Sequence, residues 1–121
     1  MTGPQAGLRT GLLPVDTNSE PELGAPAAGR VISGEPQFKT WNAEETADGL
    51  YAGIWESTAG KWQVSYDEWE FFQLISGVSI LTEADKPPVT LRSGDAYIIR
   101  PGFKGTWEVV ETTRKTYVIK L

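Results

Sequence analysis

The stretch that decides the fold is GKWQVSYDEWE, residues 60–70, near the middle of the chain. Within it the apolar residues Trp62, Val64 and Tyr66 alternate with polar ones. Successive side chains of a strand point to opposite faces, so this repeat of two predicts a half-buried β-strand. Gly77 follows after six further residues and supplies the next turn.

Short strands and turns continue on both sides of this stretch. The expected strands are residues 31–32, 38–41, 50–56, 61–66, 70–75, 78–82, 89–91, 95–99, 105–111 and 115–121. We expect one helical turn over residues 41–45, a hairpin loop at residues 85–88, where two prolines cannot donate hydrogen bonds, and a hairpin tip at Arg114 and Lys115. Many short strands without a long helix or an internal repeat predict a single all-β barrel.

The composition limits the function classes open to this chain. Its 121 residues suffice for one domain, and 40% of them are apolar. The net charge of −5 argues against nucleic acid, and the interspersed charges argue against a membrane surface. The absence of histidine and cysteine excludes a disulfide, a thiol nucleophile and a serine–histidine pair. With no apolar run suited to a signal peptide or a membrane span, we expect a cytoplasmic protein.

The chain changes character near residue 31. Residues 1–30 are rich in proline and glycine and lack a periodic apolar face, so we expect an N-terminal arm that is extended or partly disordered. Residues 31–121 are expected to form the barrel. The apolar cluster at residues 12–15 leaves two alternatives open, a mobile tail or an arm that docks on the barrel or on a partner subunit.

Two segments carry a resemblance to a known family. Residues 60–70 with Gly77 resemble the first motif of the cupin superfamily, and residues 94–105 resemble the second. A narrower resemblance, to the cupin subfamily of (S)-ureidoglycine aminohydrolase and the ethanolamine-utilisation cupin, is carried by residues 53–56, 60–62, 68–71 and 101–109. The resemblance implies a jelly-roll barrel of the RmlC-like, double-stranded β-helix type, and a homodimer.

Cupin barrels usually hold a metal ion with three histidines and one glutamate, and the resemblance allows these positions to be placed. The glutamate corresponds to Glu70, while the histidines would fall on Val64, Tyr66 and Gly105. Valine and glycine side chains have no donor atom, and a neutral phenol is a poor ligand. We therefore expect no tightly bound metal and no other cofactor, and leave a weakly bound divalent ion open.

With the family's ligand positions pointing inward, the mouth of the barrel becomes aromatic. The candidate pocket residues are Trp62, Val64, Tyr66, Gly105, Trp107 and Tyr117. A small cationic or amide-bearing molecule would fit there, held by cation–π attraction to the rings with Glu70 as its counter-charge. Glu70, withdrawn from water, is also the candidate catalytic acid or base.

Structural alternatives stay open for the same residues. The tryptophans and Tyr66 could fill the barrel interior, where small barrels need bulk. Glu70 could be neutralised by Lys61, Arg100 or an indole N–H, or lie solvated at the rim. Three functions follow: a small-molecule-binding cupin in amine or ureide catabolism, a metal-assisted enzyme resembling ureidoglycine aminohydrolase, and a structural or regulatory partner with a filled barrel.

Overall fold

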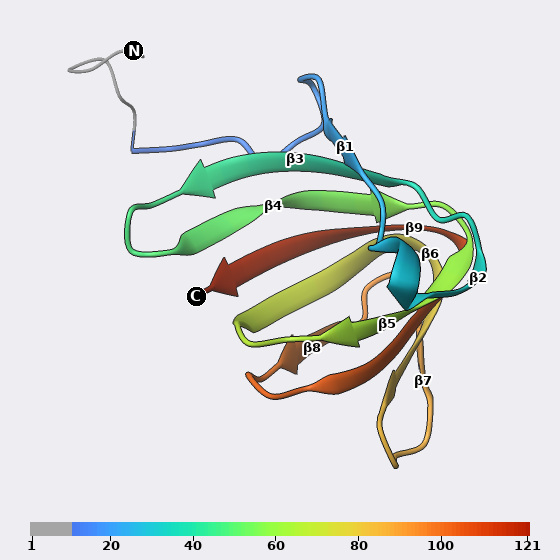
Figure 1. Cartoon of the computed structure of the whole chain (residues 1–121). Coiled ribbons are helices and arrows are strands. Elements are labelled where there is room, and N and C mark those ends of the chain that lie inside the picture. The colour runs from blue at the N-terminus through green and yellow to red at the C-terminus, as the bar shows by residue number, and fades with distance from the viewer. Residues whose placement is uncertain (1–10) are drawn as a thin grey trace.

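The computed structural model describes residues 11–121, which form a curled sheet of nine strands (Figure 1). The first ten residues of the expected arm lie outside the described part. The elements are β1 (Glu22–Gly24), the 3-10 turn η2 (Ala28–Arg30), β2 (Val31–Gly34), β3 (Phe38–Glu45), β4 (Leu50–Ser57), β5 (Gly60–Ser65), β6 (Trp69–Glu83), β7 (Val89–Leu91), β8 (Ala96–Ile99) and β9 (Lys104–Lys120). The prediction of an all-β fold is confirmed. Across residues 11–121, no helix has the length and apolarity to cross a bilayer.

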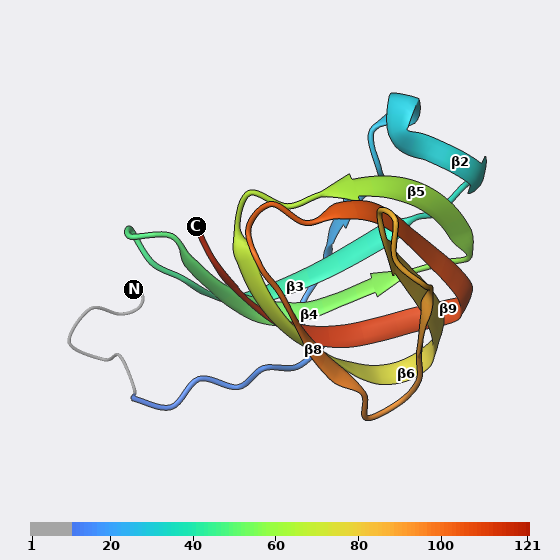
Figure 2. The ribbon, with the colours of Figure 1, turned by 90° about the horizontal axis from the view of Figure 1, so that it is seen from below.

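Two long antiparallel strands, β6 and β9, form the middle of the sheet and pair along most of their length. The other edge of β9 is shared, because β5 pairs with its first part and β4 with its second. β3 and then β1 extend the sheet beyond β4, β2 extends it beyond β5, and β7 and β8 pair with β6. Figure 2 shows how these strands curl around a common interior.

The sequence pattern predicts two strands in place of each long one, and this is wrong. β6 continues through the turn expected at residue 77 and only bends there, where Gly77 has a φ of 92° and the pairing register shifts. β9 likewise continues through Arg114 and Lys115. Both residues have partners on β4 and β6, so the ladder overrides the local turn signal.

The helical turn predicted over residues 41–45 is also wrong. These residues belong to β3, which pairs with β4 along its length. Trp41 is buried, and its indole Nε1 donates a hydrogen bond of 2.9 Å to the backbone oxygen of Ser19. Tertiary contacts therefore outweigh the local helix signal. The loop predicted at residues 85–88 is confirmed, since it joins β6 to β7.

The core lies on the inner face of the curled sheet. Phe72, Leu74 and Trp107 are each at most 1% exposed. The Trp107 indole Nε1 donates to Ser79 Oγ at 3.1 Å, and Ser79 Oγ lies 2.7 Å from Thr113 Oγ1. An unpaired buried polar group costs about 1–3 kcal/mol, so this chain of hydrogen bonds lets polar atoms lie in a packed interior.

Part of the expected N-terminal arm joins the sheet. β1 pairs with β3, and η2 leads directly into β2. In contrast, Leu12, Leu13 and Val15 lie outside any strand, with their side chains exposed. The division of the chain near residue 31 stays a prediction.

Gly77 and Gly94 provide a matched test of the bend in β6. Both have a positive φ, 92° and 93°, which strains any side chain. A Cβ added at Gly77 would collide with the backbone oxygen of Thr112, whereas nothing lies within 4 Å of a Cβ at Gly94. We expect Gly94→Ala to lower the free energy of unfolding by about 1–2 kcal/mol. Gly77→Ala should lower it by at least about 2 kcal/mol more, measured by urea denaturation. Equal losses in the two variants would contradict this account of the bend.

Candidate functional site

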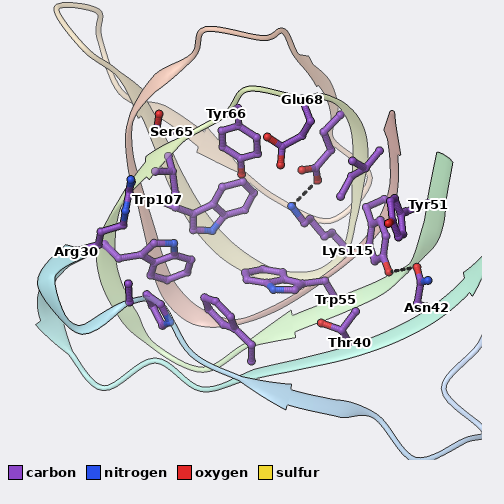
Figure 3. A pocket seen from close by; sticks show the side chains of 18 of the residues that line it. Arg30, Thr40, Asn42, Tyr51, Trp55, Ser65, Tyr66, Glu68, Trp107 and Lys115 are labelled. Carbon is purple, nitrogen blue, oxygen red and sulfur yellow. Dashed lines mark hydrogen bonds and ion pairs between the residues drawn. The ribbon is translucent and has the colours of Figure 1, made fainter. Parts of the chain in front are cut away.

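A cavity of about 590 Å³ opens on the inner face of the barrel (Figure 3). Strands β3, β4, β5, β6 and β9 supply most of its wall, and the segment from β1 to η2 and the turn between β5 and β6 supply the rest. The aromatic side chains of the wall are Phe38, Tyr51, Trp55, Trp62, Tyr66, Trp107 and Tyr117, and the charged ones are Glu22, Arg30, Glu45, Glu68, Glu70 and Lys115. The cavity is therefore an aromatic pocket with charged groups set into it.

The structure brings most of the sequence-predicted site residues together. Those that line the cavity are Trp62, Val64, Tyr66, Glu70, Trp107 and Tyr117. Gly105 does not line it: a Cβ added there would collide with the backbone oxygen of Thr82. Its role is to let neighbouring strands approach closely. Contact of the other residues with a ligand stays a prediction.

A buried ion pair lies in the wall of this cavity. Nζ of Lys115, on β9, donates to Oε2 of Glu70, on β6, at 2.7 Å. The two side chains are only 7% and 4% exposed, so water hardly reaches the pair. The sequence suggested Lys61 or Arg100 as the cation that neutralises Glu70, and the structure shows Lys115 instead.

Three aromatic rings surround the ammonium group of Lys115. Nζ lies 4.5 Å from the ring centroid of Trp107, 4.9 Å from that of Trp55 and 5.0 Å from that of Phe72. Each distance is within the range over which a ring face attracts a cation. The rings and Glu70 together stabilise a positive charge beside the very glutamate that the resemblance assigns to a metal site.

Sequence reasoning missed Lys115, although the signal was present. Tyr117 was a candidate pocket residue of the last strand, and the alternation of a strand carried two residues back gives Lys115. The hairpin tip predicted at this point interrupted the pattern. Lys115 and Tyr117 do face inward, whereas Leu121 at the chain end is 70% exposed.

Residues before position 31 also reach the cavity. Glu22, Pro26 and Arg30 belong to its wall, although this segment was expected to form an arm that is extended or partly disordered. The segment has no periodic apolar face, so the sequence offers no signal for such a role. The Tyr117 hydroxyl donates to Asn42 Oδ1 at 2.7 Å, which ties β9 to β3.

Two phenols of the wall are held in their protonated form. Burial raises the pKa of Tyr66 far above its ordinary value of 10.0, and the charges of Glu70 and Glu68 raise it further. Burial also raises the pKa of Tyr117 to about 12, with smaller contributions from Glu70 and Glu22. Both residues therefore present O–H groups, and not phenolates, at neutral pH.

The donor set of this cavity does not fit the metal ion that cupins usually hold. Val64 has no donor atom, Tyr66 is a protonated phenol, and Gly105 lies outside the cavity. Glu70, the one matching ligand, is engaged by Lys115. In the part of the chain from residue 11 onward, no three carboxylates gather in a way that could hold an ion elsewhere.

The fold and the site define a cupin-type barrel in which the ammonium group of Lys115 lies beside Glu70, the residue that the resemblance assigns as a metal ligand. The family described as EutQ-like cupin domain matches residues 44–117. The chain therefore belongs to the EutQ-like cupin domain family, which confirms the resemblance to the cupin superfamily and the jelly-roll fold. A comparison with curated protein sequences finds no match.

Solved structures of the same type agree with this assignment. A protein of unknown function of the DUF861 family from Pseudomonas syringae is 26% identical, with a TM-score of 0.78 over 88% of this chain and 46% of the other. The chain thus spans about half the length of that protein. A DUF861 family protein from Thermotoga maritima is 28% identical, with a TM-score of 0.51 over 53% of this chain and 73% of the other. The EutQ protein of Clostridium difficile, 22% identical, shares the fold with a TM-score of 0.61 over 70% of this chain and 63% of its own.

Lys115→Met tests the energetic role of the ion pair. It leaves the Glu70 carboxylate buried without its counter-charge, so we expect the free energy of unfolding to fall by about 3–5 kcal/mol. Glu70→Gln leaves the ammonium unpaired and should also destabilise the fold. The double variant removes both charges and should recover most of the loss, as measured by urea denaturation.

Arg114→Met is the matched control, because Arg114 precedes Lys115 on the same strand. Its pair with Glu56, at 2.8 Å, is more accessible, with side chains 34% and 16% exposed. Such a pair contributes about 1 kcal/mol or less. A loss at Lys115→Met no larger than at Arg114→Met would show that the buried pair does not constrain the fold.

The raised pKa values of Tyr66 and Tyr117 predict a loss of stability in alkaline solution. In the unfolded chain these phenols lose their protons near pH 10.0, whereas in the folded protein Tyr117 keeps its proton up to about pH 12 and Tyr66 beyond that. Above the unfolded pKa the folded state binds more protons, so the free energy of unfolding falls as the pH rises. Tyr66→Phe should flatten this fall in urea denaturation curves taken between about pH 8 and about pH 11. An unchanged slope would contradict the burial of the phenol.

Proposed function

We propose that this cupin binds a small organic molecule in the aromatic cavity, without a tightly held transition metal. The observation that carries this proposal is the buried pair of Glu70 and Lys115 in the wall of a cavity of about 590 Å³. Withdrawing two charges from water costs several kcal/mol per ion, and apolar side chains would fill a purely structural core at less cost. A polar pair at the wall of a cavity supports the alternative, that it faces a bound molecule.

The cavity fits a molecule with both flat and polar parts. Trp55, Trp62 and Trp107 supply apolar faces, whereas the ammonium of Lys115 and the hydroxyl of Tyr66 supply hydrogen-bond donors. A mainly apolar wall with a few polar groups is typical of small-molecule sites. An amide suits the ion pair, because its carbonyl accepts from an ammonium and its N–H donates to a carboxylate.

The family relations support a proposal for the chemical class of this ligand and for the kind of pathway it belongs to. The chain shares its fold with a EutQ protein, and its motifs resemble those of ureidoglycine aminohydrolase. We therefore propose an amine or ureide compound in a catabolic pathway as the ligand class, and a cytoplasmic homodimer as the form of the protein. Val89, Tyr97 and Ile98 are exposed apolar side chains on β7 and β8 that a second copy would cover.

The other two functions expected from the sequence receive less support. A metal-assisted reaction needs donor atoms that Val64 and Gly105 lack, and its glutamate is already paired with Lys115. A filled, inert barrel does not account for an open cavity of about 590 Å³. A catalytic role for Glu70 stays a prediction.

The experiment is a binding titration on protein treated with a chelator. Hydantoin, propionamide and n-propylammonium serve as the ureide, amide and amine probes, and tryptophan fluorescence reports binding because Trp55, Trp62 and Trp107 line the cavity. We expect a saturable change with at least one probe. Val64→Phe fills the cavity from β5 and should weaken that binding by at least about tenfold.

Val110→Phe is the control, since Val110 is exposed on β9 and the same volume is added outside the cavity. Binding in this variant should equal that of the wild type. Undiminished binding in Val64→Phe would refute the pocket. Binding that appears only after Mn²⁺ is added would refute the metal-free site.

A further inference from the structure

We propose that the ligand of this cavity carries an ammonium group and that Glu68 is the residue that recognises it. This inference rests on the proposed binding function and names the charge of the ligand and the residue that selects it. Sequence reasoning assigned the counter-charge to Glu70. That carboxylate is already neutralised by Lys115 at 2.7 Å, so it is not free to balance a second cation.

Glu68 is the acid left free beside the pair. It is half-buried, it lines the cavity, and Figure 3 shows its side chain next to Tyr66 and directed into the pocket. Among residues 11–121 it makes no hydrogen bond or ion pair. A carboxylate that is partly withdrawn from water and lacks a protein partner gains most from a cationic ligand.

The backbone before Glu68 is anchored, which orders the turn that carries this residue. The turn between β5 and β6 is held by two hydrogen bonds, from Tyr66 N to Phe103 O at 2.9 Å and from Gly102 N to Tyr66 O at 2.7 Å. The Tyr66 ring also meets that of Phe103 edge-on, with centroids 5.8 Å apart. Because the turn is already ordered, its backbone loses little entropy when Glu68 binds a ligand.

The charges of the wall favour a cation. Among the described lining residues, the acids are Glu22, Glu45, Glu68 and Glu70, and the bases are Arg30 and Lys115. The group of wall residues formed by Glu68, Glu70 and Lys115 keeps one uncompensated negative charge. Arg30 lies on the other side of the cavity from Glu68 in Figure 3. An anionic ligand near Lys115 would have to face Glu68 or displace Glu70.

The aromatic wall offers ring faces for the same cation. The face of Trp107 already holds the ammonium of Lys115 at 4.5 Å, which shows that this environment tolerates a desolvated ammonium. Trp62 lies in the same cluster, 5.2 Å from Phe38 and 6.2 Å from Trp55, and lines the cavity. In the part of the chain that the structure describes, no side-chain cation lies over the Trp62 ring. Trp62 therefore offers a second aromatic contact to a cationic ligand of this cavity.

The test compares three probes of similar size and different charge, n-propylammonium, propionamide and propionate, by fluorescence titration of the metal-free full chain. We expect n-propylammonium to bind at least about tenfold more tightly than propionamide, and propionate to bind most weakly. Glu68→Gln keeps the shape of the side chain and removes its charge. It should weaken n-propylammonium binding by about tenfold and leave propionamide binding unchanged.

Glu111→Gln is the matched control, because Glu111 is exposed on β9 and does not line the cavity. It should change the affinity for n-propylammonium by less than about twofold. Urea denaturation of both variants checks that they are folded. We expect no loss of stability, because neither carboxylate has a partner in the part of the fold that the structure describes. Equal effects of Glu68→Gln and Glu111→Gln, or propionamide binding as tightly as n-propylammonium, would refute this inference and leave the proposed function standing. If none of the three probes binds and hydantoin also fails to bind, this inference and the proposed function are both refuted.

Discussion

The ion pair of Glu70 and Lys115 links the two strands on which the barrel is built. Lys115 lies opposite Leu74 on β6 and Trp55 on β4, so its ammonium reaches Glu70 only while β9 keeps this register. A slip of β9 by one residue would turn Lys115 outward and leave the Glu70 carboxylate buried alone. The charge pattern of the cavity depends on the same contact. Because Lys115 neutralises Glu70, Glu68 is the carboxylate beside the pair that has no counter-charge among the described residues.

The pair also accounts for the residues that replace the histidines of other cupins. In those barrels several donor atoms gather around a metal cation, whereas here the cation belongs to the chain and is held by one carboxylate and three ring faces. An ammonium needs no imidazole, so Val64 and Gly105 can serve other purposes. Val64 lines the cavity, and Gly105 lets strands approach closely.

Much of the site was predictable because a strand has a period of two. The alternation of Trp62, Val64 and Tyr66 correctly placed all three on the cavity wall. The misses lie where local signals and long-range pairing disagree. The dipeptide that includes Lys115 reads as a turn in isolation, yet β4 and β6 hold it in a ladder. Arg30 follows a segment without periodicity, and its place at the cavity depends on how β1 and η2 cross the barrel.

The sequence by itself determined the fold class, the family and the inward face of the barrel, because glycine spacing and alternating side chains are local properties that any strand expresses. It also determined that no histidine-based metal site is available. The tertiary structure decided which charges meet. Glu70 and Lys115 are 45 residues apart, and only the pairing of β6 with β9 brings their side chains to 2.7 Å in a setting where water cannot replace either partner.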